Sequence, residues 1–145
     1  MNPAAPTVVA IQLSHASRAS LASVGRVRAL HERGLEGDRH AKPNSRRSVL
    51  LMEIETLESF GLEPGDVREQ VTVRGLVLSA LVFGTRLRIG EAVFEVAGMC
   101  RPCERMEELQ SGLRAAIDGR RGRFVRVVQG GAFAVGDPIE VVPPA

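Results

Sequence analysis

Residues 94–105 read FEVAGMCRPCER and contain both cysteines of the chain, Cys100 and Cys103. The branched and aromatic residues before them are typical of a strand, and Glu104 to Leu109 has a helix-like pattern. A thiol at the end of a strand, beside arginines and a helix N-terminus, lies in a field that favours the thiolate. Because the thiolate attacks electrophiles and binds soft metals, this stretch is the expected chemical centre of the chain.

Short apolar runs separated by glycine and proline turns extend to both sides of this centre. The predicted strands cover residues 7–13, 26–30, 48–52, 67–73, 85–89, 93–96, 124–128, 132–135 and 139–142, with a further apolar run at 76–82. Residues 14–23 are small and polar and predict a loop or a weak turn of helix. Helical spacing predicts one helix over 53–60 and a pair over 104–117 that is broken at Gly112.

Many short strands with few helices indicate a mostly-β chain, most simply an all-β barrel with helical insertions. A βαβ arrangement is disfavoured, because the helices do not alternate with the strands and no phosphate-binding glycine motif follows a strand. The 145 residues suit one domain, residues 1–145, without repeats or linkers.

Composition excludes several classes of protein. The net charge of +2 is too small to indicate a nucleic-acid partner, and no run approaches the roughly 20 apolar residues of a membrane span. The first ten residues do not form a signal peptide, and two cysteines without export favour the cytoplasm. Lys42 is the one lysine among 19 basic residues. The arginine bias suits recognition of phosphate or carboxylate, although it is also common in GC-rich genomes.

The cysteine pair has four readings on residues alone. A zinc site lacks its other half, since the three histidines lie far upstream without paired spacing. A thioredoxin-like redox pair lacks its βαβ context. Three readings remain open: two buried, inert cysteines, a thiolate ligand for a soft metal in an arginine-lined pocket, and a redox pair.

Two basic loops are candidate anion sites. The first carries Gly37-Asp38-Arg39-His40 with Lys42, Asn44, Arg46 and Arg47, and the second is residues 120–123, Arg-Arg-Gly-Arg. Loops on a rigid scaffold concentrate binding residues, and glycine lets the backbone approach a phosphate. Each loop is equally well read as a solvated surface. If they serve one site, they must converge near Cys103.

An ordered series of motifs resembles the MOSC domain, named for the C-terminal domain of molybdenum cofactor sulfurase. The series runs from the Gly37–His40 motif through Pro64-Gly65, Glu69-Gln70-Val71-Thr72 and Gly75-Leu76 to Leu87-x-Ile89-Gly90, Pro102-Cys103 and Gly136-Asp137. It covers about residues 27–142, as in a stand-alone bacterial member. One departure is Gln70, where the family has asparagine.

This resemblance implies a closed β-barrel, similar to the pyruvate-kinase barrel, that binds the molybdenum cofactor (a molybdopterin). By position, Cys103 is the expected molybdenum ligand and catalytic residue, while Cys100 is expected to be a packing residue. The residues expected to bind the cofactor are Asp38, Arg39, His40, Asn44, Arg46, Arg47, Glu69, Thr72, Arg101 and Arg123.

The resemblance also implies an activity, because some stand-alone members reduce N-hydroxylated compounds. The leading hypothesis is a molybdenum-dependent oxidoreductase for a small-molecule substrate, supplied by a separate electron-donating flavoprotein. The alternative is a non-catalytic module whose Cys103 carries sulfur or cofactor to an accepting enzyme. A third is a domain that has lost its site, for which Gln70 is mild support. Pyridoxal phosphate is expected only in a partner, and the oligomeric state is left open.

Overall fold

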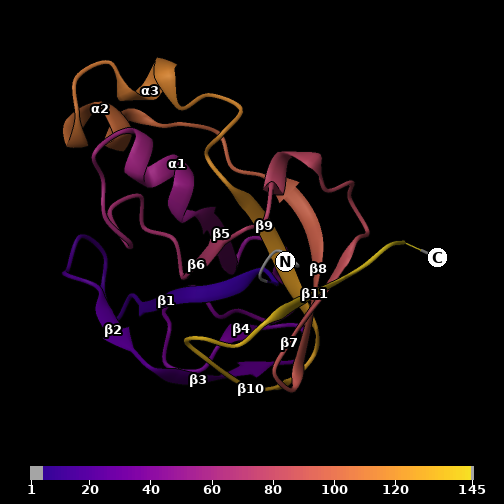
Figure 1. The fold of residues 1–145 in the computed structure, drawn as a ribbon. Helices are drawn as coiled ribbons and strands as arrows, with labels where there is room; N and C mark the ends of the chain where they lie inside the picture. The colour runs from indigo at the N-terminus through magenta and orange to yellow at the C-terminus, as the bar shows by residue number, and fades with distance from the viewer. Residues whose placement is uncertain (1–4, 145) are drawn as a thin grey trace.

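The computed structural model describes residues 5–144, and β-strands make up most of its regular structure (Figure 1). The strands are β1 (Thr7–Leu13), β2 (Ala22–Val24), β3 (Arg26–Leu30), β4 (Gly34–Leu35), β5 (Val49–Glu53), β6 (Val71–Arg74), β7 (Arg86–Ile89), β8 (Ala92–Met99), β9 (Arg123–Gln129), β10 (Gly131–Ala134) and β11 (Ile139–Val142). The helices are α1 (Ile54–Ser59), α2 (Glu104–Leu109) and α3 (Leu113–Ala116), with a 3-10 turn, η1, at Leu78–Ala80. None of the described helices is long and apolar enough to cross a membrane.

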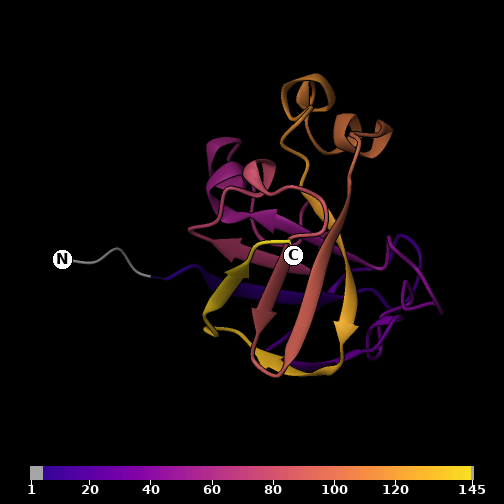
Figure 2. The same cartoon turned by 90° about the vertical axis from the view of Figure 1, so that its right-hand side faces the viewer.

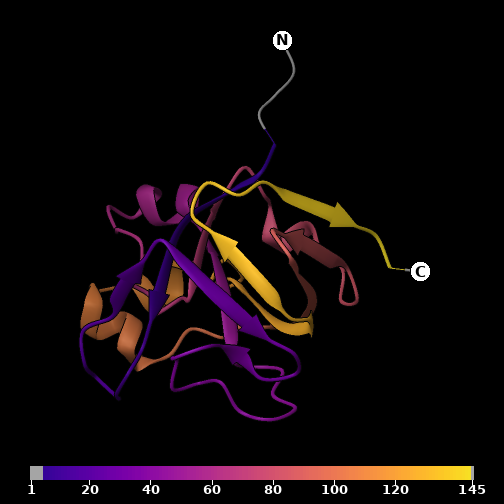
Figure 3. The ribbon, with the colours of Figure 1, turned by 90° about the horizontal axis from the view of Figure 1, so that it is seen from below.

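The strands form two hydrogen-bonded sheets. Eight follow the order β11-β7-β8-β9-β5-β6-β1-β2, and three follow the order β10-β3-β4. Of these neighbouring pairs, β5 and β6 are parallel and the others are antiparallel. Figure 3 shows β3 and β10 side by side.

The predicted closed barrel is not confirmed, since neither sheet closes on itself. The larger sheet ends at β11 on one side and β2 on the other. Near these ends, Thr7 of β1 meets Pro138 in a single bridge. Backbone hydrogen bonds from Val8 N to Asp137 O at 3.0 Å and from Ile139 N to Pro6 O at 2.7 Å flank this bridge, but the pairing does not extend into a strand ladder.

Two clusters of buried apolar residues hold the fold together. The larger cluster joins the sheets, and there the rings of Phe94 and Phe133 meet edge to face with centroids 5.5 Å apart. The smaller one packs Met106, Leu113 and Ile117 of the α2–α3 region against residues from the α1 side, including Leu57. In Figure 2, α2 and α3 stand above the ends of β8 and β9. This arrangement sets the Cys100–Cys103 segment at the junction of the sheet and the helices.

Most predicted elements are confirmed, including the break at Gly112, where φ is +82°. The strand predicted over 67–73 was wrong at its start, because residues 65–68 form a turn in which Arg68 has a φ of +66°, and β6 begins only at Val71. The apolar run at 76–82, to which no element was assigned, contains the 3-10 turn η1 at Leu78–Ala80. The short strands β2 and β4 were missed; β2 lies in a segment predicted as a loop or weak helix.

Candidate functional site

A hollow of about 430 Å³ lies where the loop after β4, the end of β8, the start of α2 and the segment before β9 come together. We call it the thiol hollow. Its lining contains seven arginine or lysine residues and no carboxylate: Arg18, Arg39, His40, Lys42, Ser45, Arg47, Leu50, Arg68, Gln70, Cys100, Arg105, Arg121 and Phe124. Ligand pockets commonly measure about 300–1,000 Å³, so the hollow is large enough for a small molecule. The positive charge of its lining favours an anionic small molecule.

The buried carboxylate of Asp38 orients His40 at the wall of the thiol hollow. Its Oδ1 accepts a hydrogen bond from Ser14 N at 2.7 Å, and its Oδ2 lies 3.3 Å from His40 Nδ1. Burial acts to raise the pKa of Asp38, but the bonds from His40, Ser14 and Gln70 outweigh it, so the pKa is lower than the ordinary 3.8. Because Nδ1 faces Asp38, Nε2 is the imidazole nitrogen left for a ligand.

Gln70 ties this pair to the sheet. Its Oε1 accepts a hydrogen bond from Leu50 N at 2.8 Å, and its Nε2 donates to Asp38 Oδ2 at 3.2 Å. The same Nε2 lies 3.2 Å from His40 Nδ1. Glutamine therefore uses both ends of its amide here. The departure from the family's asparagine leaves an ordered network, which counts against the hypothesis of a lost site.

Arg121 brings an incompletely bonded guanidinium to the thiol hollow. Only 5% of the residue is exposed, and its Nη2 donates to Val67 O at 2.6 Å. Its Nε and Nη1 are buried without a hydrogen-bond partner in residues 5–144. Leaving such charged donors unpaired costs at least about 1–3 kcal/mol. Because Arg121 also lines the hollow, its charge adds to the positive field there.

Gly122 makes the position of Arg121 possible. Its φ is +108°, a conformation that favours glycine. A Cβ at this position would fall onto the backbone carbonyl oxygen of Leu51. The chain can therefore pass directly over β5, with Arg121 turned inward and Arg120 left exposed.

Two further guanidiniums converge on Ser14. Arg39 Nε donates to Ser14 Oγ at 3.1 Å, and Arg68 Nη2 donates to the same oxygen at 3.4 Å. Burial lowers the pKa of Arg68, and repulsion from Arg105 and Arg39 lowers it further. Groups that repel one another in this way create a positive field that attracts anions.

The two cysteines differ in their environments. Cys100 lines the thiol hollow and is partly buried, whereas Cys103 is exposed at the N-cap of α2. Burial raises the pKa of the Cys100 thiol, although Arg121 and Arg47 act to lower it. A negative charge on Cys103 would raise it further. Cys103 does not line the hollow, but it lies two residues before Arg105, which does.

The predicted site residues fall into three groups. Arg39, His40 and Arg47 line the thiol hollow, Asp38 lies behind it, and Arg47 rests 4.9 Å over the ring of Phe124. The two basic loops therefore meet at one hollow, with Arg121 from the second loop, but the thiol that lines it is Cys100, and the predicted convergence near Cys103 stays a prediction. The other two groups contain residues that do not line the hollow.

Three predicted residues are buried away from it. Glu69 Oε2 accepts a hydrogen bond from Thr72 Oγ1 at 2.7 Å, and Gln12 bonds to both residues. Arg123 is buried, and its Nη1 donates to Gly122 O at 3.0 Å. These contacts support the fold around the site, and a direct role in cofactor binding remains a prediction.

The last three predicted residues are exposed. Arg101 lines a different hollow, beside Met99, Pro102 and Arg114. Asn44 and Arg46 lie on the loop after β4, where Asn44 has a φ of +58° and its backbone N–H donates to Glu32 O. Asparagine tolerates this conformation better than most residues, so Asn44 has a structural role in the turn.

Sequence reasoning missed five lining residues that carry a charge or a thiol, namely Arg18, Arg68, Cys100, Arg105 and Arg121. Arg121 and Arg123 both lie on the second loop predicted to bind an anion, but only Arg123 was predicted to bind the cofactor. The signal that separates them is Gly122, whose contact with β5 becomes visible only in three dimensions. Arg68 and Arg105 lie in segments predicted as strand and helix, where an arginine is ordinarily solvated.

Glu69 gives a testable pH dependence of stability. Burial raises the pKa of its carboxyl above the ordinary 4.5, while the bond from Thr72 and the charge of Arg121 partly oppose this. The folded state thus holds the proton to a higher pH than the unfolded state, and stability falls as pH rises from about 4.5 through the raised pKa. We expect Glu69→Gln to lack this loss. In urea unfolding, the free energy of unfolding of the variant minus that of wild type should therefore increase as pH rises over that range.

The lowered pKa of Asp38 changes stability with pH in the opposite sense. Asp38 is present in both wild type and Glu69→Gln, so its contribution cancels when their free energies of unfolding are subtracted. Glu58→Gln, at an exposed position, is the control and should follow wild type. Parallel stability–pH curves for wild type and Glu69→Gln would contradict the raised pKa.

Within residues 5–144, no group of three or more histidine, cysteine or acidic residues could hold a metal ion by itself. A metal here would need ligands from a cofactor besides a cysteine. Fold and site together define a small, mostly-β domain with a cationic hollow and a pair of thiols at its edge.

The sequence matches the family model of the MOSC domain over residues 11–140, and the chain belongs to this family. Its fold is similar to that of the YuaD protein from Bacillus subtilis, with a TM-score of 0.81 and 20% identity over 94% of this chain and 95% of that one. YiiM from Geobacillus stearothermophilus has a TM-score of 0.75 and 20% identity, over 94% and 75% of the two chains. YiiM from Escherichia coli has a TM-score of 0.74 and 19% identity, over 96% and 71%. No curated protein sequence matched the chain.

Proposed function

We propose that the thiol hollow binds the phosphate of the molybdenum cofactor and that the domain reduces N-hydroxylated compounds. The observation that carries the proposal is Arg121, a buried guanidinium with two nitrogens that lack partners within residues 5–144. Arginine matches the geometry of phosphate, and a charge-assisted bond to each free nitrogen would satisfy the site. The family is associated with this cofactor, which supports the choice of anion.

Several residues of the hollow fit the group. Arg121, Arg47 and Arg39 would hold the phosphate, and a cysteine would supply the soft ligand that molybdenum accepts. We assign that ligand to Cys103. It holds the family's position and is exposed, whereas burial keeps Cys100 in its thiol form to higher pH. Bound cofactor would supply a centre that passes two electrons to the substrate.

Residues of the chain itself deliver a proton and stabilise negative charge during the reduction. Reduction breaks the N–O bond, consumes two electrons and two protons, and releases the reduced base and water. His40 is held by Asp38 through Nδ1, so its Nε2 can deliver one proton to the departing oxygen. The arginines stabilise negative charge that develops on this oxygen. The electrons come from a separate flavoprotein.

A carrier function is the second candidate, and the exposure of Cys103, three residues after Cys100, favours it. An exposed Cys103 can hold sulfur as a persulfide, and a neighbouring thiol can release it by thiol–disulfide chemistry. This function requires no retained metal.

Metal content separates the two candidates. The chain is expressed in a host that makes the cofactor, and molybdenum is measured by mass spectrometry after purification. We expect stoichiometric molybdenum and reduction of benzamidoxime by chemically supplied electrons. Absence of molybdenum together with a persulfide on Cys103 would reject the reductase in favour of the carrier.

A further inference from the structure

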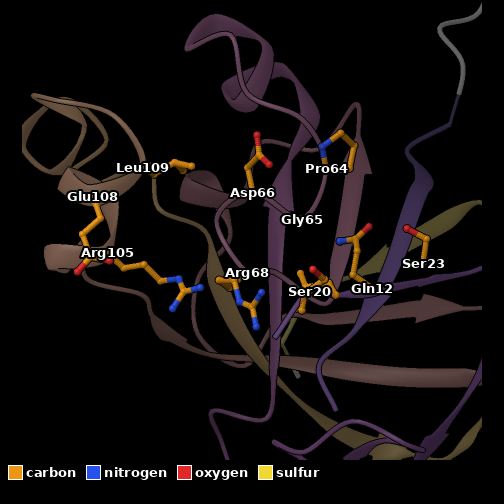
Figure 4. Close-up of a pocket in the computed structure, with 11 residues that line it drawn as sticks. Gln12, Ser20, Ser23, Pro64, Gly65, Asp66, Arg68, Arg105, Glu108 and Leu109 are labelled. Carbon is orange, nitrogen blue, oxygen red and sulfur yellow. The ribbon is translucent and has the colours of Figure 1, made fainter. Parts of the chain in front are cut away.

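A second hollow, of about 440 Å³, adjoins the thiol hollow and shares Arg68 and Arg105 with it. We call it the side hollow. Figure 4 shows Arg105 reaching from α2 toward Arg68, with Gln12 and Ser23 on the opposite side and Asp66 near the edge. The proposed function uses no other part of this space.

Two arginines, Arg68 and Arg105, and two acids, Asp66 and Glu108, line the side hollow. Arg105 has no hydrogen-bond or ion-pair partner for its side chain within residues 5–144, and it lowers the pKa of Arg68 after burial has done so. Asp66 Oδ2 accepts a bond from Glu63 N at 2.8 Å, and Glu108 lies 3.4 Å from Arg18. Glu108 is therefore paired with Arg18, whereas Asp66 keeps its negative charge. Arg68 already donates to Ala19 O at 2.8 Å and to Ser14 Oγ at 3.4 Å, so Arg105 is the guanidinium that is free to bind an anion.

The opposite wall offers an acceptor. Gln12 is buried, and its Nε2 donates to the backbone oxygen of Glu69 at 2.9 Å and to Thr72 Oγ1 at 3.3 Å. Because a backbone oxygen can only accept, the amide nitrogen must face it, which fixes the orientation of the amide. Gln12 Oε1 is left without a partner among the described residues. A donor from a ligand would satisfy it.

Apolar side chains lie between these ends. Leu21, Pro64 and Leu109 also line the side hollow. A complementary molecule therefore has an anionic end, an apolar middle and an N–H or O–H donor at its far end. That description fits a small organic carboxylate better than an inorganic ion.

We propose that the side hollow is a second binding site, for a small organic carboxylate with a hydrogen-bond donor at the end opposite its charge. Arg105 binds the carboxylate, Arg68 adds positive charge beside it, and Gln12 accepts the hydrogen bond from the donor. The site is independent of the proposed reductase activity. Its position beside the thiol hollow means that its ligand lies next to whatever the thiol hollow holds.

Three related probes test this site by calorimetry on the purified protein. The first, 4-aminobenzoate, carries both features; benzoate lacks the donor, and 4-aminobenzamide lacks the charge. We expect 4-aminobenzoate to bind at least about tenfold tighter than 4-aminobenzamide, which corresponds to one charge-assisted contact, and benzoate to lie between them. Arg105→Gln should abolish this preference, whereas Arg74→Gln, at an exposed position on β6, should keep it.

Two controls separate this site from the thiol hollow. Arg121→Met should leave 4-aminobenzoate binding unchanged while it weakens binding of inorganic phosphate. If 4-aminobenzoate and 4-aminobenzamide bind equally, the proposal is overturned. It is also overturned if inorganic phosphate displaces 4-aminobenzoate more effectively than benzoate does, because Arg68 and Arg105 would then serve the phosphate of the cofactor.

Discussion

Cys103→Ser is expected to abolish both molybdenum retention and the reduction of benzamidoxime, while Cys100→Ser keeps most of both. A serine hydroxyl is a poor ligand for a soft metal and is not ionised at neutral pH, so the metal would lose its protein ligand. Cys100 is close in size to serine and lies partly buried at the wall of the hollow, where its thiol donates a weak hydrogen bond to the neighbouring carbonyl of Arg101 at 3.9 Å. The measurements are molybdenum per chain and single-turnover reduction.

The pair of variants also tests the alternative assignment, because Cys100 is the cysteine that lines the thiol hollow. If Cys100→Ser loses the metal and Cys103→Ser keeps it, the ligand is Cys100 and the family position misleads. If both variants lose activity equally and no preparation contains molybdenum, the carrier function is favoured.

Arg121→Met is expected to act in opposite directions on stability and on binding. In the ligand-free protein the change removes a buried charge with two unpaired nitrogens, and a flexible apolar side chain fills much of the space. We expect the free energy of unfolding to rise by about 1–3 kcal/mol, even after the bond to Val67 O is lost. Affinity for inorganic phosphate should fall by at least about tenfold, as charge-assisted bonds disappear.

The opposite signs make the result diagnostic. A purely structural arginine would lower stability when replaced and would leave phosphate binding unchanged. Arg26→Met is a matched control on β3, where the side chain is exposed, and it should change neither quantity. If Arg121→Met unfolds more easily than wild type, Arg121 is a structural residue and the anion site loses its main support.

The sequence predicts the helices and strands better than the site. Helices and strands follow local patterns of neighbouring residues, whereas the site depends on contacts between residues far apart in the chain. Alternation in Arg86–Ile89 and the helical spacing of Ile54 and Leu57 are local patterns, and both elements are confirmed. The turn at Arg68 is not local in the same sense. An arginine at a φ of +66° goes against backbone preference and is held by Ala19 and Ser14, which lie about fifty residues earlier.

The same distinction between local patterns and long-range contacts explains which site residues could be predicted from the sequence. Asp38 and His40 are two residues apart and are recognisable as a motif, and the structure brings them together. Arg121 and Arg123 are equivalent in the sequence, and only the path of the backbone over Leu51 decides which guanidinium meets the hollow. The family series contributed Cys103, whereas Cys100 comes from geometry.

The division of the apolar interior into two clusters has a consequence for exchange of bound groups. The α2–α3 segment, which follows Cys103 and carries Arg105, rests on the smaller cluster, while β8 and β9 belong to the larger one. Regions with separate cores open as separate cooperative units, each with its own free energy. The segment can therefore detach while the sheets stay intact, giving a bulky group a route in or out that leaves the fold in place.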